Sequence, residues 1–144
     1  MKADEFLFFP KNFLWGACLS DYQHFGGSVC DLPLIWTAKH YTLYREDFEL
    51  ISKLKLNAFR TGIEWARIEP KEGTVDKGAV KFYHDYFKAL RKREIKTFVT
   101  LHHFTNPAWV HDHGGWLSEK VVEKFVEYVD FVSSEFSEYI DYYV

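Results

Sequence analysis

Short apolar stretches that are typical of β-strands return along this sequence about every forty residues. They begin near residues 13, 57, 96 and 139. Each of the three stretches between them carries apolar side chains three and four residues apart, as helices do. Alternation of strands and helices at this spacing implies right-handed crossovers and a parallel sheet. The sequence therefore predicts an α/β fold built from successive βα units.

The predicted elements have definite bounds. Strands are expected at 13–17, 57–63, 96–101 and 139–144, the first of them buried, and a Gly- and Pro-containing loop is expected from Gly26 to Pro33. The first helix has Thr37 as a candidate N-cap, the second follows Asp76, and the third begins near Ser118. Their apolar stripes are Tyr41, Tyr44, Phe48, Ile51 and Leu54; Ala79, Phe82, Tyr83, Tyr86, Phe87 and Leu90; and Val122, Phe125, Val129, Val132 and Phe136.

Two architectures fit four strands and three helices. They could form a small open sheet, or the first half of a (β/α)8 barrel, which typically needs about 250 residues. No linker or low-complexity segment interrupts residues 1–144, so we expect a single domain or part of one. In a barrel, functional side chains lie at the carboxyl ends of strands. Polar residues gather there, at 20–24, 64–67 and 102–106.

The composition narrows the classes of molecule that this chain is expected to bind. Charged residues are 27% of the chain, mixed in sign, with a formal net charge of -3, which gives no electrostatic reason to expect nucleic acid or an anionic membrane surface. No stretch approaches the roughly 20 apolar residues of a membrane span, and residues 1–10 do not read as a signal peptide. Cys18 and Cys30 make neither a disulfide framework nor a tetrahedral metal site. We therefore predict a cytoplasmic protein without metal or cofactor.

Three motifs include the first three predicted strands, or their ends, and the residues that follow. They are FPKNFLWGA with SDYQ at 9–17 and 20–23, NAFRTGIEWARIEP at 57–70, and TLHHFTNP with GGWL at 100–107 and 114–117. In order and at this spacing, they resemble the N-terminal part of family 1 glycoside hydrolases, the retaining β-glycosidases. The resemblance implies the first half of a (β/α)8 barrel, incomplete in these 144 residues, with strands one to four and helices one to three.

The resemblance also implies roles for individual side chains. In the family, a glutamine after the first strand and a histidine after the third bind hydroxyls of the sugar at the cleavage point, and these match Gln23 and His103. The arginine that supports the nucleophilic carboxylate matches Arg60. An amide and an imidazole each offer a donor and an acceptor, as sugar hydroxyls require. Trp116 and Trp65 could supply aromatic faces near the cleft.

Ordinary structural roles are the alternative interpretation of each of these residues. A lone glutamine after a strand more often bonds backbone, and a lone arginine at a strand end is more often a surface or ion-paired residue. Glu64 lies at a strand end, yet the family does not use this position catalytically, so we interpret it as structural. The pairs at 102–103 and 111–113 could ligate a metal in a metal-dependent hydrolase, but solvated loop histidines are the favoured interpretation.

The sequence departs from the family pattern in three places. Phe25 stands where the family commonly has glutamate, Cys18 and Asp21 occupy places that usually hold small residues, and His103 is followed by Phe-Thr rather than Trp-Asp. These departures bear on which sugar is preferred.

The catalytic carboxylates decide the expected activity. Retaining glycosidases need two of them about 5–5.5 Å apart. The family places the acid/base in an Asn-Glu-Pro motif after the fourth strand and the nucleophile on the seventh, and neither can be assigned within these 144 residues. We therefore expect a sugar-binding portion of a β-glucosidase- or β-galactosidase-type enzyme, a fragment, split-gene product or truncated subunit that is inactive alone. Its expected partners are a β-linked glycoside or oligosaccharide, and a second chain that completes the barrel or another copy. The alternatives are an inactive carbohydrate-binding protein and a vestigial domain.

Overall fold

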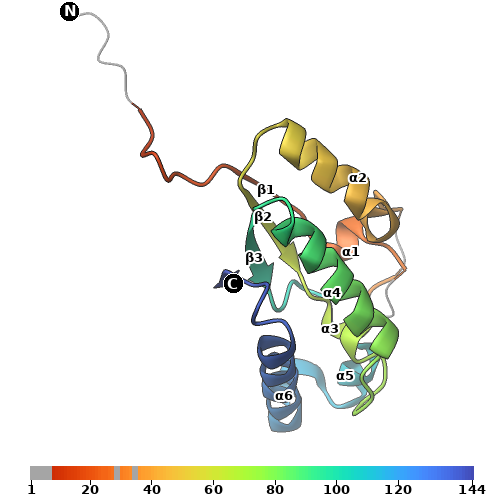
Figure 1. Cartoon of the computed structure of the whole chain (residues 1–144). Coiled ribbons are helices and arrows are strands. Elements are labelled where there is room, and N and C mark those ends of the chain that lie inside the picture. The colour runs from red at the N-terminus through yellow and green to blue at the C-terminus, as the bar shows by residue number, and fades with distance from the viewer. Residues whose placement is uncertain (1–7, 28–29, 34–35) are drawn as a thin grey trace, which may run out of the picture.

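The computed structural model of the chain describes residues 8–27, 30–33 and 36–144 (Figure 1). The N-terminal residues 1–7, and positions 28–29 of the predicted 26–33 loop, lie outside the described residues. The strands are β1 (Gly16–Cys18), β2 (Ala58–Gly62), β3 (Lys96–Thr100) and β4 (Tyr142–Tyr143). The helices are α1 (Asp21–His24), α2 (His40–Lys53), α3 (Trp65–Ile68), α4 (Lys77–Arg91), α5 (Ala108–Asp112), the 3-10 turn η1 (Gly115–Leu117) and α6 (Glu119–Glu135).

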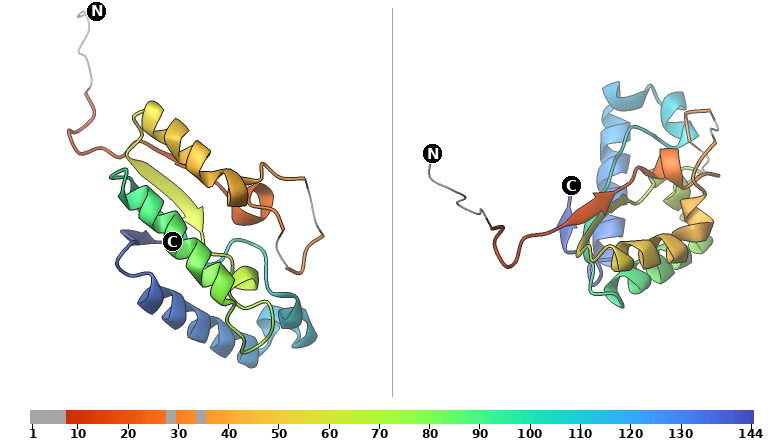
Figure 2. Two further views of the ribbon diagram at one scale, coloured as in Figure 1. Left: turned by 45° about the vertical axis from the view of Figure 1, so that its right-hand side comes forward. Right: turned by 90° about the horizontal axis from the view of Figure 1, so that it is seen from above.

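The four strands form one parallel sheet in the order β1-β2-β3-β4, which confirms the predicted βα alternation. The long helices α2, α4 and α6 lie along one side of this sheet (Figure 2). Cys18 pairs in register with Arg60, Arg60 with Phe98, and Phe98 with Tyr142, so these four residues form one row across the sheet. Their side chains lie on the face opposite the helices. Residues in one row of a sheet point to the same face. This inner face is the one that a closed barrel turns toward its axis.

Helix α4 forms where the sequence predicts it, and it organises the core. The Asp76 side chain accepts hydrogen bonds from the backbone N–H groups of Gly78 and Ala79, at 2.7 and 3.1 Å, and so caps the helix N-terminus. The apolar stripe that follows, with Tyr83 and Phe87 fully buried, packs against the sheet and the neighbouring helices. Burial of this stripe stabilises the helix more than its intrinsic propensity does.

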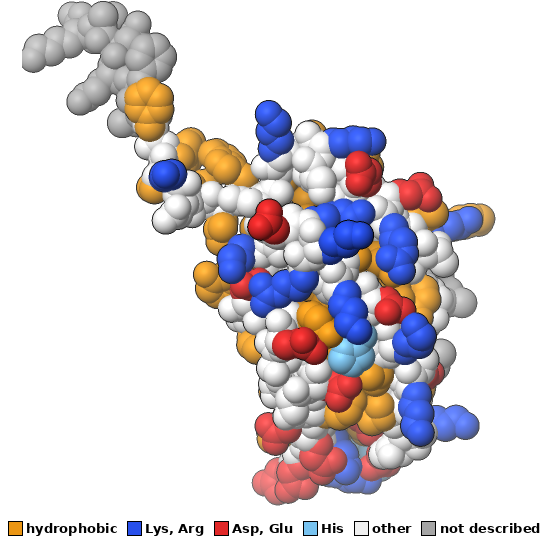
Figure 3. All heavy atoms as spheres, viewed as in Figure 1, with side chains coloured by type: hydrophobic (Ala, Val, Ile, Leu, Met, Phe, Trp, Pro, Cys, Tyr) orange, Lys and Arg blue, Asp and Glu red, His pale blue; other side chains and the backbone are white. Residues whose placement is uncertain are grey.

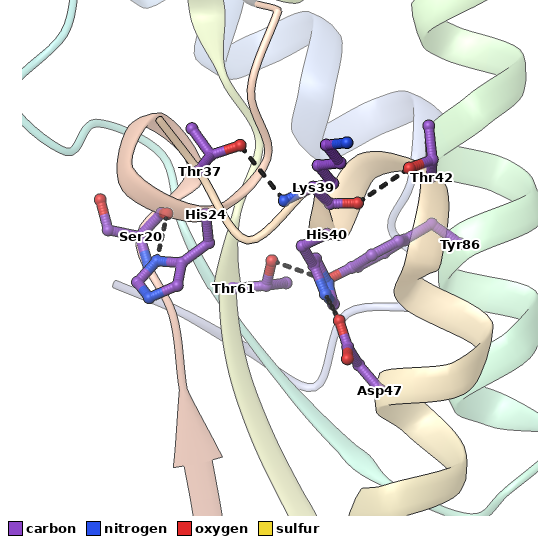
Figure 4. Close-up of polar contacts among 9 residues, drawn as sticks. All are labelled: Ser20, His24, Thr37, Lys39, His40, Thr42, Asp47, Thr61 and Tyr86. Carbon is purple, nitrogen blue, oxygen red and sulfur yellow. Dashed lines mark hydrogen bonds and ion pairs between the residues drawn. The ribbon is translucent and has the colours of Figure 1, made fainter. Parts of the chain in front are cut away.

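A buried polar chain joins α2, α4 and β2 (Figure 4). The His40 Nδ1 lies 2.5 Å from the Asp47 carboxylate, its Nε2 lies 2.8 Å from the Tyr86 hydroxyl, and that hydroxyl lies 3.0 Å from the Thr61 Oγ1. Because burial lowers the pKa of His40, its ring is neutral near pH 7. An ionised Asp47 requires the proton on Nδ1, so Nε2 accepts from Tyr86 and Tyr86 accepts from Thr61.

Several local predictions were wrong, each for a tertiary reason. The first strand begins at Gly16 rather than residue 13, and it is exposed, because β1 is an edge strand without a neighbour on one side. Helix α2 begins at His40; Thr37 does not cap it but accepts a hydrogen bond from the Lys39 N–H at 3.2 Å. Val122 of α6 is 48% exposed, and Val121 is buried in its place.

The short elements were not predicted. Helices α1, α3 and α5 and the turn η1 fill the segments after β1, β2 and β3 that the sequence reads as loops. The fourth strand was expected from residue 139, but Tyr139 and Ile140 are buried in the turn that precedes β4.

The visible outer surface of the helical layer mixes cationic and anionic side chains without one dominant sign (Figure 3). Among the described residues, every helix is too short or too polar to cross a bilayer.

Candidate functional site

Three predicted site residues lie within or just after the first three strands. Gln23 is on α1 just after β1, Arg60 is within β2, and His103 follows β3. Because parallel strands end at one edge of a sheet, these side chains gather at the same edge. Burial, followed by the charges of Arg60 and His102, lowers the pKa of His103. Its imidazole is therefore neutral near pH 7 and can both donate and accept a hydrogen bond.

These three side chains have spare hydrogen-bonding capacity. Arg60 donates through Nε to the Thr100 Oγ1 at 2.8 Å, and its two terminal nitrogens have no hydrogen-bond partner among the described residues. Within the same part of the chain, the Gln23 amide and both ring nitrogens of His103 make no hydrogen bond either. Gln23 is exposed, and the unbonded nitrogens of the half-buried Arg60 and His103 reach solvent, so all three side chains are available to a ligand.

The loop after β3 has a strained backbone beside His103. Phe104 has a positive φ of 69°, a conformation that costs a non-glycine residue about 1–2 kcal/mol, although its side chain is 79% exposed. The Thr105 N–H donates to the His103 carbonyl at 2.9 Å and closes this turn. Such strain is common where a loop aims a functional side chain.

Trp116 is linked to Gln23, Arg60 and His103 through neighbouring residues of the loop after β3. It is on η1, it is 42% exposed, and its indole N–H donates to the Asn106 Oδ1 at 3.0 Å. Its ring meets His102 edge-on, with centroids 5.0 Å apart, and within the described part of the chain it makes no hydrogen bond to Gln23, Arg60 or His103. The structure therefore joins Trp116 to the loop that carries His103.

Trp65 does not line a cleft, and that prediction was wrong. It is 1% exposed, it stacks on Tyr128 with centroids 5.5 Å apart, and its indole N–H donates to the Glu69 Oε2 at 2.9 Å.

Two buried carboxyl groups lie beneath the site, and sequence reasoning noted the first only as a departure from the family. Asp21 is 5% exposed and accepts a hydrogen bond from the Gly62 N–H at 3.0 Å. A Cβ at Gly62 would lie 2.0 Å from the Asp21 Oδ2, so the carboxyl fills the space that a side chain at 62 would need. Burial, followed by repulsion from Glu64, raises the pKa of Asp21 to about 8. Glu64 is 4% exposed and is paired with Arg67 at 3.2 Å.

The remaining histidines are part of the surface. His111 is exposed, as expected of a solvated loop histidine. His113 differs from that expectation, because its Nε2 lies 2.8 Å from the Glu72 carboxylate. Glu72 also pairs with Lys120 at 2.8 Å, and the bonds from Lys120 and His113 lower the pKa of Glu72 to about 2. Across the described residues, no group of three or more His, Cys, Asp or Glu side chains is arranged to hold a metal ion.

One well-formed hollow lies elsewhere. A cavity of about 570 Å³ at the start of α2 is lined by residues that include Phe25, Trp36 and Tyr41, and none of Gln23, Arg60 and His103 lines it. The unused hydrogen-bonding groups of Gln23, Arg60 and His103 therefore define the candidate site better than the size of a cavity does.

Sequence comparison finds one matching family. The profile of glycosyl hydrolase family 1 matches residues 36–144. The 6-phospho-beta-galactosidase of Staphylococcus haemolyticus is 35% identical over 90% of this chain, and Beta-glucosidase 23 of Arabidopsis thaliana is 34% identical over 94%. The chain spans about a third of the length of these relatives, 31% and 30% respectively.

Solved structures match the fold over nearly the whole chain. The beta-glycosidase BGL167 superimposes with a TM-score of 0.88 and 34% identity, covering 94% of this chain and 36% of that one. The beta-glucosidase from Thermotoga maritima, solved in complex with a methoxycarbonyl-substituted glucoimidazole, has a TM-score of 0.84 and 28% identity, and covers 94% and 36%. The four strands and the helices between them thus correspond to about a third of each complete chain.

Proposed function

Because the chain belongs to glycosyl hydrolase family 1, we propose that these residues form the sugar-gripping part of a retaining β-glycosidase. Gln23 and His103 bind hydroxyls of the pyranose at the cleavage point, and Arg60 supports the carboxylate that attacks it. One observation carries the proposal: these three side chains gather at one edge of the sheet with hydrogen-bonding groups that the described residues leave unused.

The chemistry of each group suits its proposed role. A sugar hydroxyl donates and accepts, and so do the Gln23 amide and the neutral His103 ring. Thr100 fixes the Nε end of Arg60, which leaves the two terminal nitrogens to face a carboxylate. A guanidinium in that position keeps the carboxylate ionised and ready to attack.

The pair of reacting carboxylates is proposed to come from outside residues 1–144. Asp21 and Glu64 are the coupled carboxyl groups near the site, but both are buried, and Asp21 lies against the backbone of Gly62. A glycoside cannot pass between them. The complete site would cleave a β-linked glycoside with retention, through a covalent glycosyl-enzyme intermediate.

The inner face of the sheet supports a partner that completes the barrel. Phe98 and Tyr142 stack on this face with centroids 4.4 Å apart, and Tyr142 is 49% exposed. The strands β1 and β4 are both edges of the four-stranded sheet, and edge strands recruit further strands. We propose that this face and these edges are covered by the rest of a family 1 barrel, on the same or a second chain. Light scattering tests this, since a stable compact monomer of the 144-residue chain would contradict it.

The function is tested by binding and by complementation. The 144-residue chain is expected to bind a glucoimidazole in calorimetry and to release no aryl alcohol from aryl β-glycosides. Mixing it with a family 1 relative that lacks the matching N-terminal third should restore hydrolysis, and R60A, Q23A and H103A should each abolish most of it. The matched control is D85N, which removes an exposed ion pair on α4.

The outcomes separate the alternatives. Turnover by the pure chain would refute the proposal that the reacting carboxylates lie elsewhere. Binding without restored hydrolysis would favour an inactive carbohydrate-binding protein, and no binding would favour a vestigial domain. A cytoplasmic location remains part of the proposal, and fractionation of the source cells tests it.

A further inference from the structure

The loops after β1 and β3 are joined to each other by one asparagine. The Asn106 N–H donates to the Asp31 Oδ1 at 2.9 Å, and the Asn106 Nδ2 donates to the Asp31 Oδ2 at 2.7 Å. The Asp31 N–H donates back to the Asn106 carbonyl at 2.9 Å, and Cys30 forms an antiparallel bridge with Pro107 beside it. Two segments 75 residues apart in sequence are thereby held in register.

The other side of the same amide group holds two aromatic side chains. The Asn106 Oδ1 accepts the Trp116 indole N–H at 3.0 Å and lies 3.1 Å from the His102 Nε2. An indole N–H can only donate and an ionised carboxylate can only accept, so Trp116 and Asp31 together fix which end of the amide is oxygen. An oxygen facing His102 requires a donor there. His102 therefore carries its proton on Nε2.

We propose that Asn106 is a positioning residue for the sugar site. Its carboxamide latches the loop that bears His103 to the loop that follows Gln23, and it fixes the Nε2–H tautomer of His102. This inference rests on the proposed function, since the importance of the latch lies in where it holds the two sugar-binding side chains.

The packing around His102 shows how the latch acts on its neighbour. The His102 ring meets Trp116 and Phe125 edge-on, with centroids 5.0 and 6.0 Å apart, so this side chain is clamped by rings as well as by Asn106. His103 is the next residue, and its ring nitrogens make no hydrogen bond among the described residues. Clamping His102 leaves His103 little freedom to move its ring from the site. A loosened loop would lose sugar affinity, because a displaced group no longer meets its hydroxyl.

Exchanging the two partners tests the latch. N106D places two carboxylates face to face and should weaken glucoimidazole binding about tenfold, as the loss of a supporting contact often does. The exchanged double variant D31N/N106D keeps every bond in principle, because the carboxylate at position 106 still accepts from Trp116 and His102, and the amide at position 31 donates to that carboxylate. It should restore affinity to within about threefold of the starting chain. D85N on α4 is the control, with unchanged affinity.

A second measurement does not depend on sugar binding. Long-range proton–nitrogen NMR correlations of the histidine rings should show His102 as the Nε2–H tautomer in the starting chain and in the exchanged variant. In N106L the tautomer preference should be lost and the Trp116 indole proton should shift.

Sugar binding and the NMR tautomer pattern together distinguish a failure of the proposed function from a failure of the Asn106 latch. If the starting chain binds no glucoimidazole but the NMR pattern follows the exchange, the proposed function fails and the latch stands. An Nδ1–H tautomer of His102 in the starting chain, an exchanged variant that fails to recover, or an N106D chain with full affinity would each overturn the latch.

Discussion

Replacing Asp21 with asparagine should stabilise the folded chain at neutral and alkaline pH, although it removes a buried carboxyl group. The pKa of this carboxyl is raised from 3.8 to about 8, first by burial and then by Glu64. The charged groups and hydroxyls that interact with it are Glu64, Arg67, Arg60, Tyr83, Tyr86 and Tyr128. An asparagine still accepts from the Gly62 N–H, and its NH₂ can face the buried Glu64 Oε1, which has no partner among the described residues.

The size of the effect follows from proton linkage. Between pH 4 and pH 8 the unfolded chain has released the Asp21 proton while the folded chain retains it. The free energy of unfolding therefore falls as pH rises, by about 1.4 kcal/mol per pH unit from this one group. From pH 5 to pH 7 the loss is about 3 kcal/mol, a large share of the 5–15 kcal/mol that stabilises a typical domain. The D21N variant has no such proton to retain.

Urea denaturation followed by circular dichroism at pH 5, 6, 7 and 8 measures this difference. The gap between D21N and the starting chain should widen with each pH step, and subtraction of the two curves cancels the histidines, which titrate in both. The control D85N removes an exposed carboxylate and should run parallel to the starting chain. A gap that stays constant across the four pH values would refute the raised pKa, and D21N less stable at pH 8 would refute the argument as a whole.

Three further predictions concern the loops and the core. E72Q removes the negative charge that pairs with Lys120 and His113. The stability that Glu72 contributes above pH 4.5, and which is lost as pH falls toward about 2, should therefore disappear from the pH profile of thermal unfolding. F104G should raise the urea midpoint, because glycine adopts a φ of 69° without the strain of about 1 kcal/mol that an exposed phenylalanine bears there. F48A should cost about 3–5 kcal/mol in the same assay, since Phe48 is fully buried between α2, β2 and α4.

Features that depend on nearby residues were predictable from the sequence. Asp76 caps the helix that it precedes, and the stripe through Tyr83 and Phe87 is buried, because capping and amphipathic spacing act within a few turns. The parallel order of the strands also followed, because right-handed crossovers leave few other arrangements. The placement of Gln23 and His103 at strand ends followed from that order.

Features that depend on distant contacts were not predictable. Trp65 and Trp116 look alike in the sequence, yet one is 1% and the other 42% exposed. Both contact Phe125 of α6, but Trp65 is also enclosed by Trp109 and Tyr128. Asp21 has room for its carboxyl because residue 62, 41 positions away, is glycine. The Asn106 contact with Asp31 spans 75 positions. No periodicity within one element carries this information.

Two arginines of the second motif differ in how much of their bonding is used within the fold, and this difference supports the proposal of Arg60 for the site. Arg67 bonds Glu64 at 3.2 Å and the Gly26 carbonyl at 2.9 Å, and its guanidinium lies 4.3 Å from the centre of the Tyr41 ring. Its Nε and one terminal nitrogen are bonded within the fold. Arg60, seven residues earlier, has one bond through Nε and no ion pair among the described residues. The two unbonded terminal nitrogens of Arg60 are available to an incoming anion, and the proposed nucleophilic carboxylate would be such an anion.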